Sequence, residues 1–215
     1  MSIKNYKELL ALKEVGRIVR LALEAMAASV RAGVTTAELA KIGGKVMREN
    51  GARSAPRMVY GFPGDVLISL NDEAVHGIPS DSRKVRAGDL VKLDVTFEKA
   101  MKFARADHRV NEIGRAVERE VRRSGFRVIR ELGGHGIGRT IHEEPSVPNY
   151  DDPLAQQRLT EGLVLTVEPI IAMGSGKPKD GGDGWTVKTA DGSLSAHYEH
   201  TIVITDGAPM LLTAA

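Results

Sequence analysis

Cysteine does not occur among the 215 residues, so disulfides and thiolate metal sites are excluded. The chain also lacks a dense block of lysine and arginine. Its 30 basic residues nearly balance the 28 acidic ones, for a net charge of +2. Basic residues recur instead along helical surfaces, as in 115–127, which is typical of a solvated helix face. We therefore expect no specific nucleic-acid partner.

Long apolar runs are missing as well. No stretch of about 18 apolar residues is present, so the sequence predicts no transmembrane helix. The first residues, MSIKNYKELLALKEVGR, are charged and amphipathic rather than typical of a signal peptide. We therefore expect a cytoplasmic protein without a membrane partner. The apolar content is ample for a core, and the length fits one large domain or two small ones.

The sequence repeats itself with an offset of 74 residues. Five pairs fall in this register: Arg31 with Arg105, Glu38 with Glu112, Gly51 with Gly125, Gly88 with Gly162, and Asp94 with Glu168. In each half a predicted helix ends at a glycine, and a glycine turn later precedes a short apolar strand that carries an acid. One match would mean little, but five in one register predict two related halves that face each other.

The repeat gives Asp94 and Glu168 equivalent positions near the axis that relates the two halves. Aspartate is depleted in strands and costly to bury without a partner. Two buried acids that approach each other repel unless they share a proton or a cation. With His135 as a candidate ligand and no cysteine in the chain, a divalent metal is the simplest counter-charge.

Four short motifs carry residues suited to catalysis or metal binding. They are NDEAVHGIP (71–79), GGHGIGRTIHEEP (133–145), LTVEPII (165–171) and SLSAHYEHTIVIT (193–205). Each also has an ordinary structural explanation, because a lone His76 is more often a hydrogen-bonded structural residue and glycines around His135 are consistent with a tight turn. Taken together, three carboxylates and a glycine-framed histidine form a ligand set that suits Mn, Fe, Co or Zn.

Together, GGHGIGRTIHEEP, LTVEPII, DGWTVKT (183–189) and SAHYEHTIVIT closely resemble the motifs of the type I methionine aminopeptidases, and nearly the whole chain takes part. The resemblance implies the α+β pita-bread fold, with two pseudo-symmetric halves around a central antiparallel sheet and a single catalytic domain over residues 1–215. It also implies removal of the initiator methionine from the N-termini of nascent polypeptides in the cytoplasm. We expect a monomer, and a transient contact with the ribosome stays an open alternative.

The resemblance, carried over by motif, also assigns roles to single residues. The implied metal ligands are Asp94, His135, Glu168 and Glu199. The implied pocket for the methionine side chain consists of Phe62, Leu67, Ile141 and Trp185, with Val59 left open. In the implied mechanism Glu168 is the general base for a metal-activated water, His142 stabilises the developing oxyanion, and His76 contacts the peptide group on the leaving side. The implied metal is Co, Mn, Fe, Zn or Ni.

One ligand of the family has no counterpart in this chain. The family carries a second aspartate eleven residues after the first, and that position holds Arg105. In the 74-residue register, 97–106 falls on 23–32, the tail of the first predicted helix. The resemblance therefore implies the loss of roughly thirty residues near Thr96-Phe97, about a strand pair and most of a helix. We expect one well-bound metal instead of the family's two, a second bound weakly or not at all, and impaired activity.

Three other residues are candidates to replace the absent ligand. Asp107 aligns with Gly33 in a loop before a helix, and Glu98 lies too far along an extended strand unless the chain turns back. His197 stands where the family usually has glutamine. With Glu199 expected inside a strand, alternation places His197 on the same face as Glu199. We interpret His197 as a bystander rather than a ligand.

The alternative function is a non-enzyme. A pita-bread relative that binds peptide N-termini or another partner, with little or no hydrolysis, would keep most of the site and lack the second aspartate. Release of methionine from a Met-Ala-Ser peptide with added metal distinguishes the two hypotheses. A proline-specific peptidase of the same fold is disfavoured by Trp185 in DGWTVKT.

Overall fold

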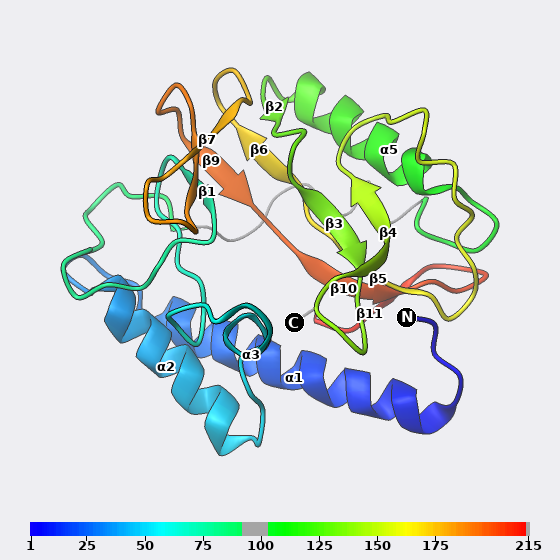
Figure 1. The fold of residues 1–215 in the computed structure, drawn as a ribbon, viewed down its shortest axis with the longest axis horizontal. Helices are drawn as coiled ribbons and strands as arrows, with labels where there is room; N and C mark the ends of the chain where they lie inside the picture. The colour runs from blue at the N-terminus through cyan, green and yellow to red at the C-terminus, as the bar shows by residue number, and fades with distance from the viewer. Residues whose placement is uncertain (92–102, 214–215) are drawn as a thin grey trace.

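The computed structural model describes residues 1–91 and 103–213 (Figure 1). The predicted ligand Asp94, the alternative Glu98 and the junction near Thr96-Phe97 lie outside the described residues. Within the described part, no helix is long and apolar enough to cross a membrane.

Local sequence signals explain where the described helices begin. The helices are α1 (Tyr6–Ser29), α2 (Thr36–Glu49), α3 (Ala55–Tyr60) and α5 (Val110–Arg123). The Asn5 side chain accepts a hydrogen bond from the Glu8 N–H at the start of α1. At the start of α2, Thr35 and Glu38 form the predicted capping box. α3 ends at Gly61, whose φ of 71° is a left-handed conformation that glycine adopts without strain.

The structure confirms the 74-residue repeat. α2 and α5 each have 14 residues and begin and end in the same register. The backbone hydrogen bond from Gly33 N to Val85 O recurs between Asp107 N and Leu159 O. Gly33 and Asp107 also share a positive φ, 91° and 67° respectively. The two halves therefore use the same loop before the helix, and Asp107 occupies the position that its alignment with Gly33 predicts.

Short antiparallel strands form three described sheets. The strands are β1 (Glu73–Val75), β2 (Arg127–Val128), β3 (Gly133–Gly136), β4 (Glu143–Pro148), β5 (Val164–Val167), β6 (Ile170–Ala172), β7 (Pro178–Asp180), β8 (Val187–Thr189), β9 (Ser195–His197), β10 (His200–Val203) and β11 (Met210–Leu211). The largest sheet has the order β11-β10-β5-β3-β4, and the smaller ones are β2-β6-β9 and β1-β8-β7. Every pair of neighbouring strands is antiparallel, as predicted.

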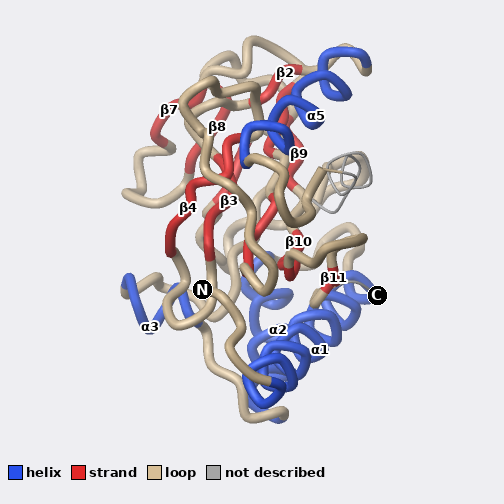
Figure 2. Tube along the Cα trace, turned by 90° about the vertical axis from the view of Figure 1, so that its right-hand side faces the viewer, coloured by secondary structure: helices blue, strands red, loops and turns tan. Residues whose placement is uncertain are grey.

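Helices cover the two ends of this strand region. Figures 1 and 2 both show α5 at one end of the strands and the α1–α2 pair at the other. Ile113 and Val117 of α5 are fully buried against a core that includes Leu165 of β5 and Ile202 of β10. Leu39, the counterpart of Ile113 in the first half, is buried in a separate cluster. Each half thus anchors its own helix, which leaves the strand ends between them to carry polar groups.

One predicted element is wrong in detail, because Glu199 does not lie inside a continuous strand. β9 ends at His197 and β10 begins at His200. β9 pairs with β6, whereas β10 pairs with β5, so the chain changes sheets at 198–199. The partner strands are interrupted at the facing position by 168–169, where a proline has no N–H to donate to a ladder. The break places Glu168 and Glu199 opposite each other.

Candidate metal centre and active site

Two acids and a histidine meet at the break between the sheets. Glu168 directly follows β5, His197 ends β9, and Glu199 lies between β9 and β10. Each offers a ligand atom within 4.8 Å of the others, which makes the three a candidate metal-binding group among the described residues. His197 Nε2 lies 3.9 Å from Glu168 Oε2 and 4.0 Å from Glu199 Oε2.

His135 approaches the same group from β3. Its Nδ1 lies 2.8 Å from the Gly136 carbonyl oxygen, which only accepts, so Nδ1 carries the hydrogen. Its Nε2 lies 3.1 Å from Glu168 Oε1. A neutral His135 therefore presents a lone pair to a carboxylate oxygen, an arrangement that only a proton or a cation between them stabilises. The donor set suits a divalent transition metal.

The glycines around His135 belong to a strand rather than to a tight turn. A Cβ on Gly134 would lie 2.3 Å from the Thr166 carbonyl oxygen, and one on Gly136 would lie 2.1 Å from that of Glu144. The neighbouring strands β5 and β4 approach β3 too closely for any side chain at these positions. The glycines therefore bring His135 within reach of Glu168.

Polar neighbours hold Glu168 in place. The Thr166 hydroxyl donates to Glu168 Oε1 at 2.5 Å and accepts from the His135 backbone N–H at 3.0 Å. The Asn149 side chain donates to the Glu168 carbonyl oxygen at 2.6 Å. Only 9% of Glu168 is exposed, so these contacts supply hydrogen bonds that water would otherwise make.

The charged groups of Glu168, His135 and Glu199 shift one another's pKa values. Burial acts to raise the pKa of Glu168, but the His135 imidazole and the Thr166 hydroxyl together keep it below its usual value. Burial opposes ionisation of His135, yet the Glu168 carboxylate raises the pKa of its imidazole. Removal from water by the surrounding protein, together with the negative charge of Glu168, raises the pKa of the Glu199 carboxyl. Solvent still reaches 41% of this side chain and screens part of the effect.

His142 lies against His135. The two ring centroids are 4.1 Å apart in an edge-to-face arrangement. The Tyr60 hydroxyl of α3 is 2.5 Å from His142 Nδ1. Burial and the neighbouring His135 lower the pKa of His142, so its ring is neutral at pH 7 and retains one N–H donor.

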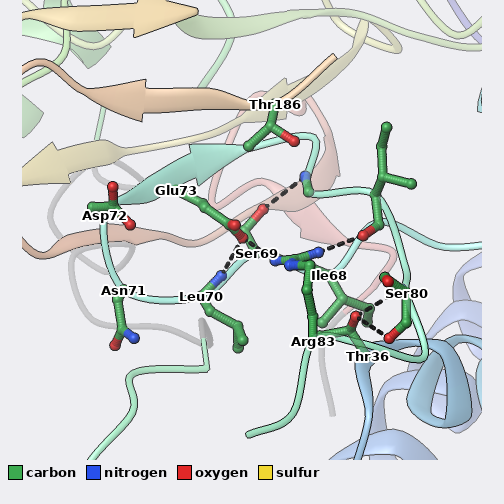
Figure 3. Close-up of polar contacts among 12 residues, drawn as sticks. Thr36, Ile68, Ser69, Leu70, Asn71, Asp72, Glu73, Ser80, Arg83 and Thr186 are labelled. Atoms are coloured by element: carbon green, nitrogen blue, oxygen red, sulfur yellow. Dashed lines mark hydrogen bonds and ion pairs between the residues drawn. The ribbon is translucent and has the colours of Figure 1, made fainter. Parts of the chain in front are cut away.

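His76 reaches the site from a loop that is braced by a buried ion pair. It follows β1 with a φ of 61°, and burial lowers the pKa of its imidazole while the nearby Glu168 carboxylate opposes that shift. Figure 3 shows the Arg83 guanidinium beside the Glu73 carboxylate, to which it donates. The guanidinium also donates to the Ile78 carbonyl oxygen. The Leu70 N–H donates to the same Glu73 carboxylate at 2.8 Å. Arg83 therefore ties the segment after His76 back to Glu73 of β1.

Two of the residues predicted for the methionine pocket contact each other. Phe62 is 1% exposed, and its ring meets Trp185 edge-to-face with centroids 5.2 Å apart. Leu67 and Ile141 are half-buried, whereas Val59 is 52% exposed on α3. The contact between Phe62 and Trp185 joins segments more than a hundred residues apart in the chain, which is the arrangement that a shared pocket requires.

Neither Arg105 nor Asp107 belongs to the cluster of acids. Arg105 Nε donates to His108 Nε2 at 2.8 Å, and His108 Nδ1 lies 2.7 Å from the Glu112 carboxylate at the start of α5. Asp107 has a side chain that is 94% exposed and lies 3.8 Å from Arg158. Both residues therefore serve the loop before α5, as their counterparts do in the first half.

Local sequence patterns indicate three residues of this region only weakly or not at all. Strand alternation put His197 on the face of Glu199, but its closeness to both acids depends on the change of sheet. Tyr60 and Arg83 carry no motif signal, since a tyrosine on a short helix and an arginine in a loop are common on protein surfaces. Their roles follow only from the contacts with His142 and Glu73.

Comparisons with known proteins agree with this geometry. The sequence pattern of metallopeptidase family M24 matches residues 11–99 and 96–206. Methionine aminopeptidase 2 of Bacillus subtilis is 42% identical, with 99% of each chain covered, and methionine aminopeptidase of Escherichia coli K12 is 36% identical, with 99% of this chain and 94% of that one covered. The crystal structure of methionine aminopeptidase from Thermotoga maritima superposes with a TM-score of 0.94 at 29% identity, with 100% of both chains covered.

The comparisons also locate a shortening of the chain. The alignment with the Bacillus subtilis relative spans 247 positions, 32 more than the 215 residues present here. The two segments that match the family pattern meet at residues 96–99. Both findings agree with the predicted loss near Thr96-Phe97. The full-length structural match agrees with the predicted two-halved architecture.

Proposed function

The chain belongs to metallopeptidase family M24 as a methionine aminopeptidase with the pita-bread fold, and on this premise we propose that it removes the initiator methionine from nascent polypeptides with a single well-bound metal. The observation that carries the proposal is the convergence of His135, Glu168 and Glu199 at the break between the sheets. Cytoplasmic polypeptides with a free N-terminal methionine are the proposed substrates.

The donor set of His135, Glu168 and Glu199 would hold the metal. Three protein ligands with an open position are typical of catalytic sites for such ions. The bound cation supplies Lewis acidity, which polarises a carbonyl group and lowers the pKa of water beside it. The negative charge of Glu168 and Glu199 balances one divalent cation, and the family's second aspartate, which would help to hold another, has no counterpart here.

Glu168 is the proposed general base. Its carboxylate is buried and is kept ionised by His135 and Thr166, so it accepts a proton from the attacking water at neutral pH. Its burial also keeps bulk water away from the carboxylate. The nucleophile then adds to the carbonyl carbon of the N-terminal methionine, and negative charge develops on the carbonyl oxygen. Collapse of this adduct restores the carbonyl group and breaks the peptide C–N bond, while Glu168 returns the proton to the departing amine.

The two other histidines complete the proposed mechanism. Neutral His142 donates its remaining N–H toward the developing oxyanion, and Tyr60 orients its ring. His76 contacts the peptide group on the leaving side from its braced loop. Phe62 and Trp185 bury the methionine side chain, which supports a preference for methionine.

Release of methionine from a Met-Ala-Ser peptide with added Mn or Co tests the proposal. We expect metal-dependent turnover that Glu168→Gln lowers at least about 100-fold, because the general base and a metal ligand are lost together. Glu161→Gln is the matched control, since Glu161 is an exposed acid in the turn before β5, the strand that Glu168 follows, and it should leave turnover unchanged. Binding of the peptide without turnover would favour the non-catalytic alternative.

Calorimetry on metal-free protein tests the number of metals. One tight site per chain is the expected result for Co or Mn. Two sites of comparable affinity would contradict the mononuclear proposal. In the methionine-release assay, we expect turnover below that of the Bacillus subtilis relative, because a site with one metal stabilises the oxyanion less than the two-metal site that the family resemblance implies.

A further inference from the structure

We propose that His197 is a ligand of the metal centre and replaces a donor that the shortened chain has lost. The inference rests on the proposed function, because it extends the same metal site. His197 lies close to both acids of the site. Its Nε2 is about equally distant from Glu168 and Glu199, at 3.9 and 4.0 Å.

These distances are near those of a closed coordination shell. Ligands at about 2.1 Å from a tetrahedral ion are separated by roughly 3.4 Å, the edge of the tetrahedron. The two separations of His197 exceed that edge by about half an ångström. Small side-chain rotations of His197, Glu168 and Glu199 would close such a gap.

The other three donors lie around the Glu168 carboxylate. His135 Nε2 faces Oε1 at 3.1 Å, and His197 Nε2 faces Oε2 at 3.9 Å. Glu199 completes the group from the opposite strand. Two imidazoles and two carboxylates form a set that binds Zn, Co, Ni or Fe, and the two negative charges balance one divalent ion.

The backbone fixes His197 at this position. His197 pairs with Ile170 in the β6–β9 ladder, and the next residue donates its N–H to the Pro169 carbonyl at 3.2 Å. Both partners lie within two residues of Glu168. His197 is therefore held by the same segment that carries the central carboxylate, and 24% of its side chain remains exposed. A ligand held by strand pairing loses little freedom when it binds the metal.

X-ray absorption on the cobalt-loaded wild-type protein gives a direct test, because imidazole ligands are counted from their scattering. Two imidazoles per cobalt are expected, from His135 and His197. A single imidazole would overturn the inference. This measurement needs no variant and so does not depend on whether a substituted chain folds.

Calorimetric titration of variants with cobalt gives a second test, with His197→Gln as the main variant. We expect its cobalt affinity to fall at least about tenfold, the lower limit for loss of even an outer-shell partner. His108→Gln is the matched control, because His108 bonds to Arg105 and Glu112 outside the cluster, and its affinity should be unchanged. An affinity within about threefold of wild type for His197→Gln would overturn the inference.

His135→Gln separates failure of the inference from failure of the proposed function. If His135→Gln weakens cobalt binding and His197→Gln does not, the metal site stands and the role of His197 is wrong. If neither substitution weakens binding, the metal lies elsewhere and both proposals fall. Circular dichroism of each variant before titration confirms that the chain is folded.

Discussion

Arg83→Met removes the brace of the loop that carries His76. The Arg83 guanidinium donates to the Glu73 carboxylate and to the carbonyl oxygens of Ile78 and Ile68. Methionine has a similar length and fills the same space, but it makes none of these bonds. The substitution therefore isolates the loss of charge and hydrogen bonding from the loss of volume.

The expected magnitude follows from the burial of the pair. Removing one partner of a buried ion pair costs about 3–5 kcal/mol, because the remaining charge is left without compensation. The side chains of Arg83 and Glu73 are 26% and 11% exposed, and the Leu70 N–H still bonds to Glu73. Both facts favour the lower end, about 3 kcal/mol. For a domain of this size the melting midpoint should fall by roughly 6–12 °C.

Urea unfolding with chelator present is the appropriate assay, since bound metal would add its own stabilisation. Arg123→Met is the matched control, because Arg123 pairs with Glu120 at 2.6 Å on the exposed face of α5. An exposed pair of this kind contributes at most about 1 kcal/mol. Methionine release should also fall for Arg83→Met at temperatures where the variant is folded, because the His76 loop loses two of its tethers.

A loss of stability for Arg83→Met no larger than that for Arg123→Met would refute the reasoning. It would mean that solvent or neighbouring groups compensate Glu73 when the guanidinium is absent. The predicted loss of stability together with unchanged methionine release would mean that Arg83 stabilises the fold but does not position His76.

Three other predictions concern packing, charge and metal. Gly134→Ala should cost at least about 3 kcal/mol in urea unfolding, because its Cβ would lie 2.3 Å from a backbone oxygen, whereas Gly207→Ala meets nothing within 4 Å and should be nearly neutral. Glu118→Gln should destabilise the protein at pH 7. Burial acts to raise the pKa of Glu118, but Arg130 and other donors outweigh burial and lower it, so the ionised carboxylate stabilises the fold. The difference from wild type should shrink as the pH falls through the lowered pKa of Glu118, and equal midpoints at pH 7 would contradict this. Removing the metal with a chelator should lower the melting midpoint by roughly 5–11 °C relative to protein with metal at 100 times its dissociation constant, and an unchanged midpoint would argue against a bound metal.

Much of the fold could be predicted from local signals and from the repeat. The capping box at Thr35 and Glu38 and the stop at Gly51 locate α2 almost to the residue. The 74-residue offset then predicts α5 before any contact is known, because a duplicated sequence folds into the same local structure twice. The error over Glu199 arose because alternation cannot reveal where a strand exchanges one partner for another.

The sequence by itself determined which side chains are available to the site: two described acids, histidines in glycine-rich or strand contexts, and no cysteine. It also determined the two-halved plan, since helix caps and glycine stops act over a few residues. Only the tertiary structure decided that His197 lies between Glu168 and Glu199, that Tyr60 contacts His142, and that Arg83 braces the His76 loop. These contacts join segments far apart in the chain, and their distances depend on packing that no local pattern encodes.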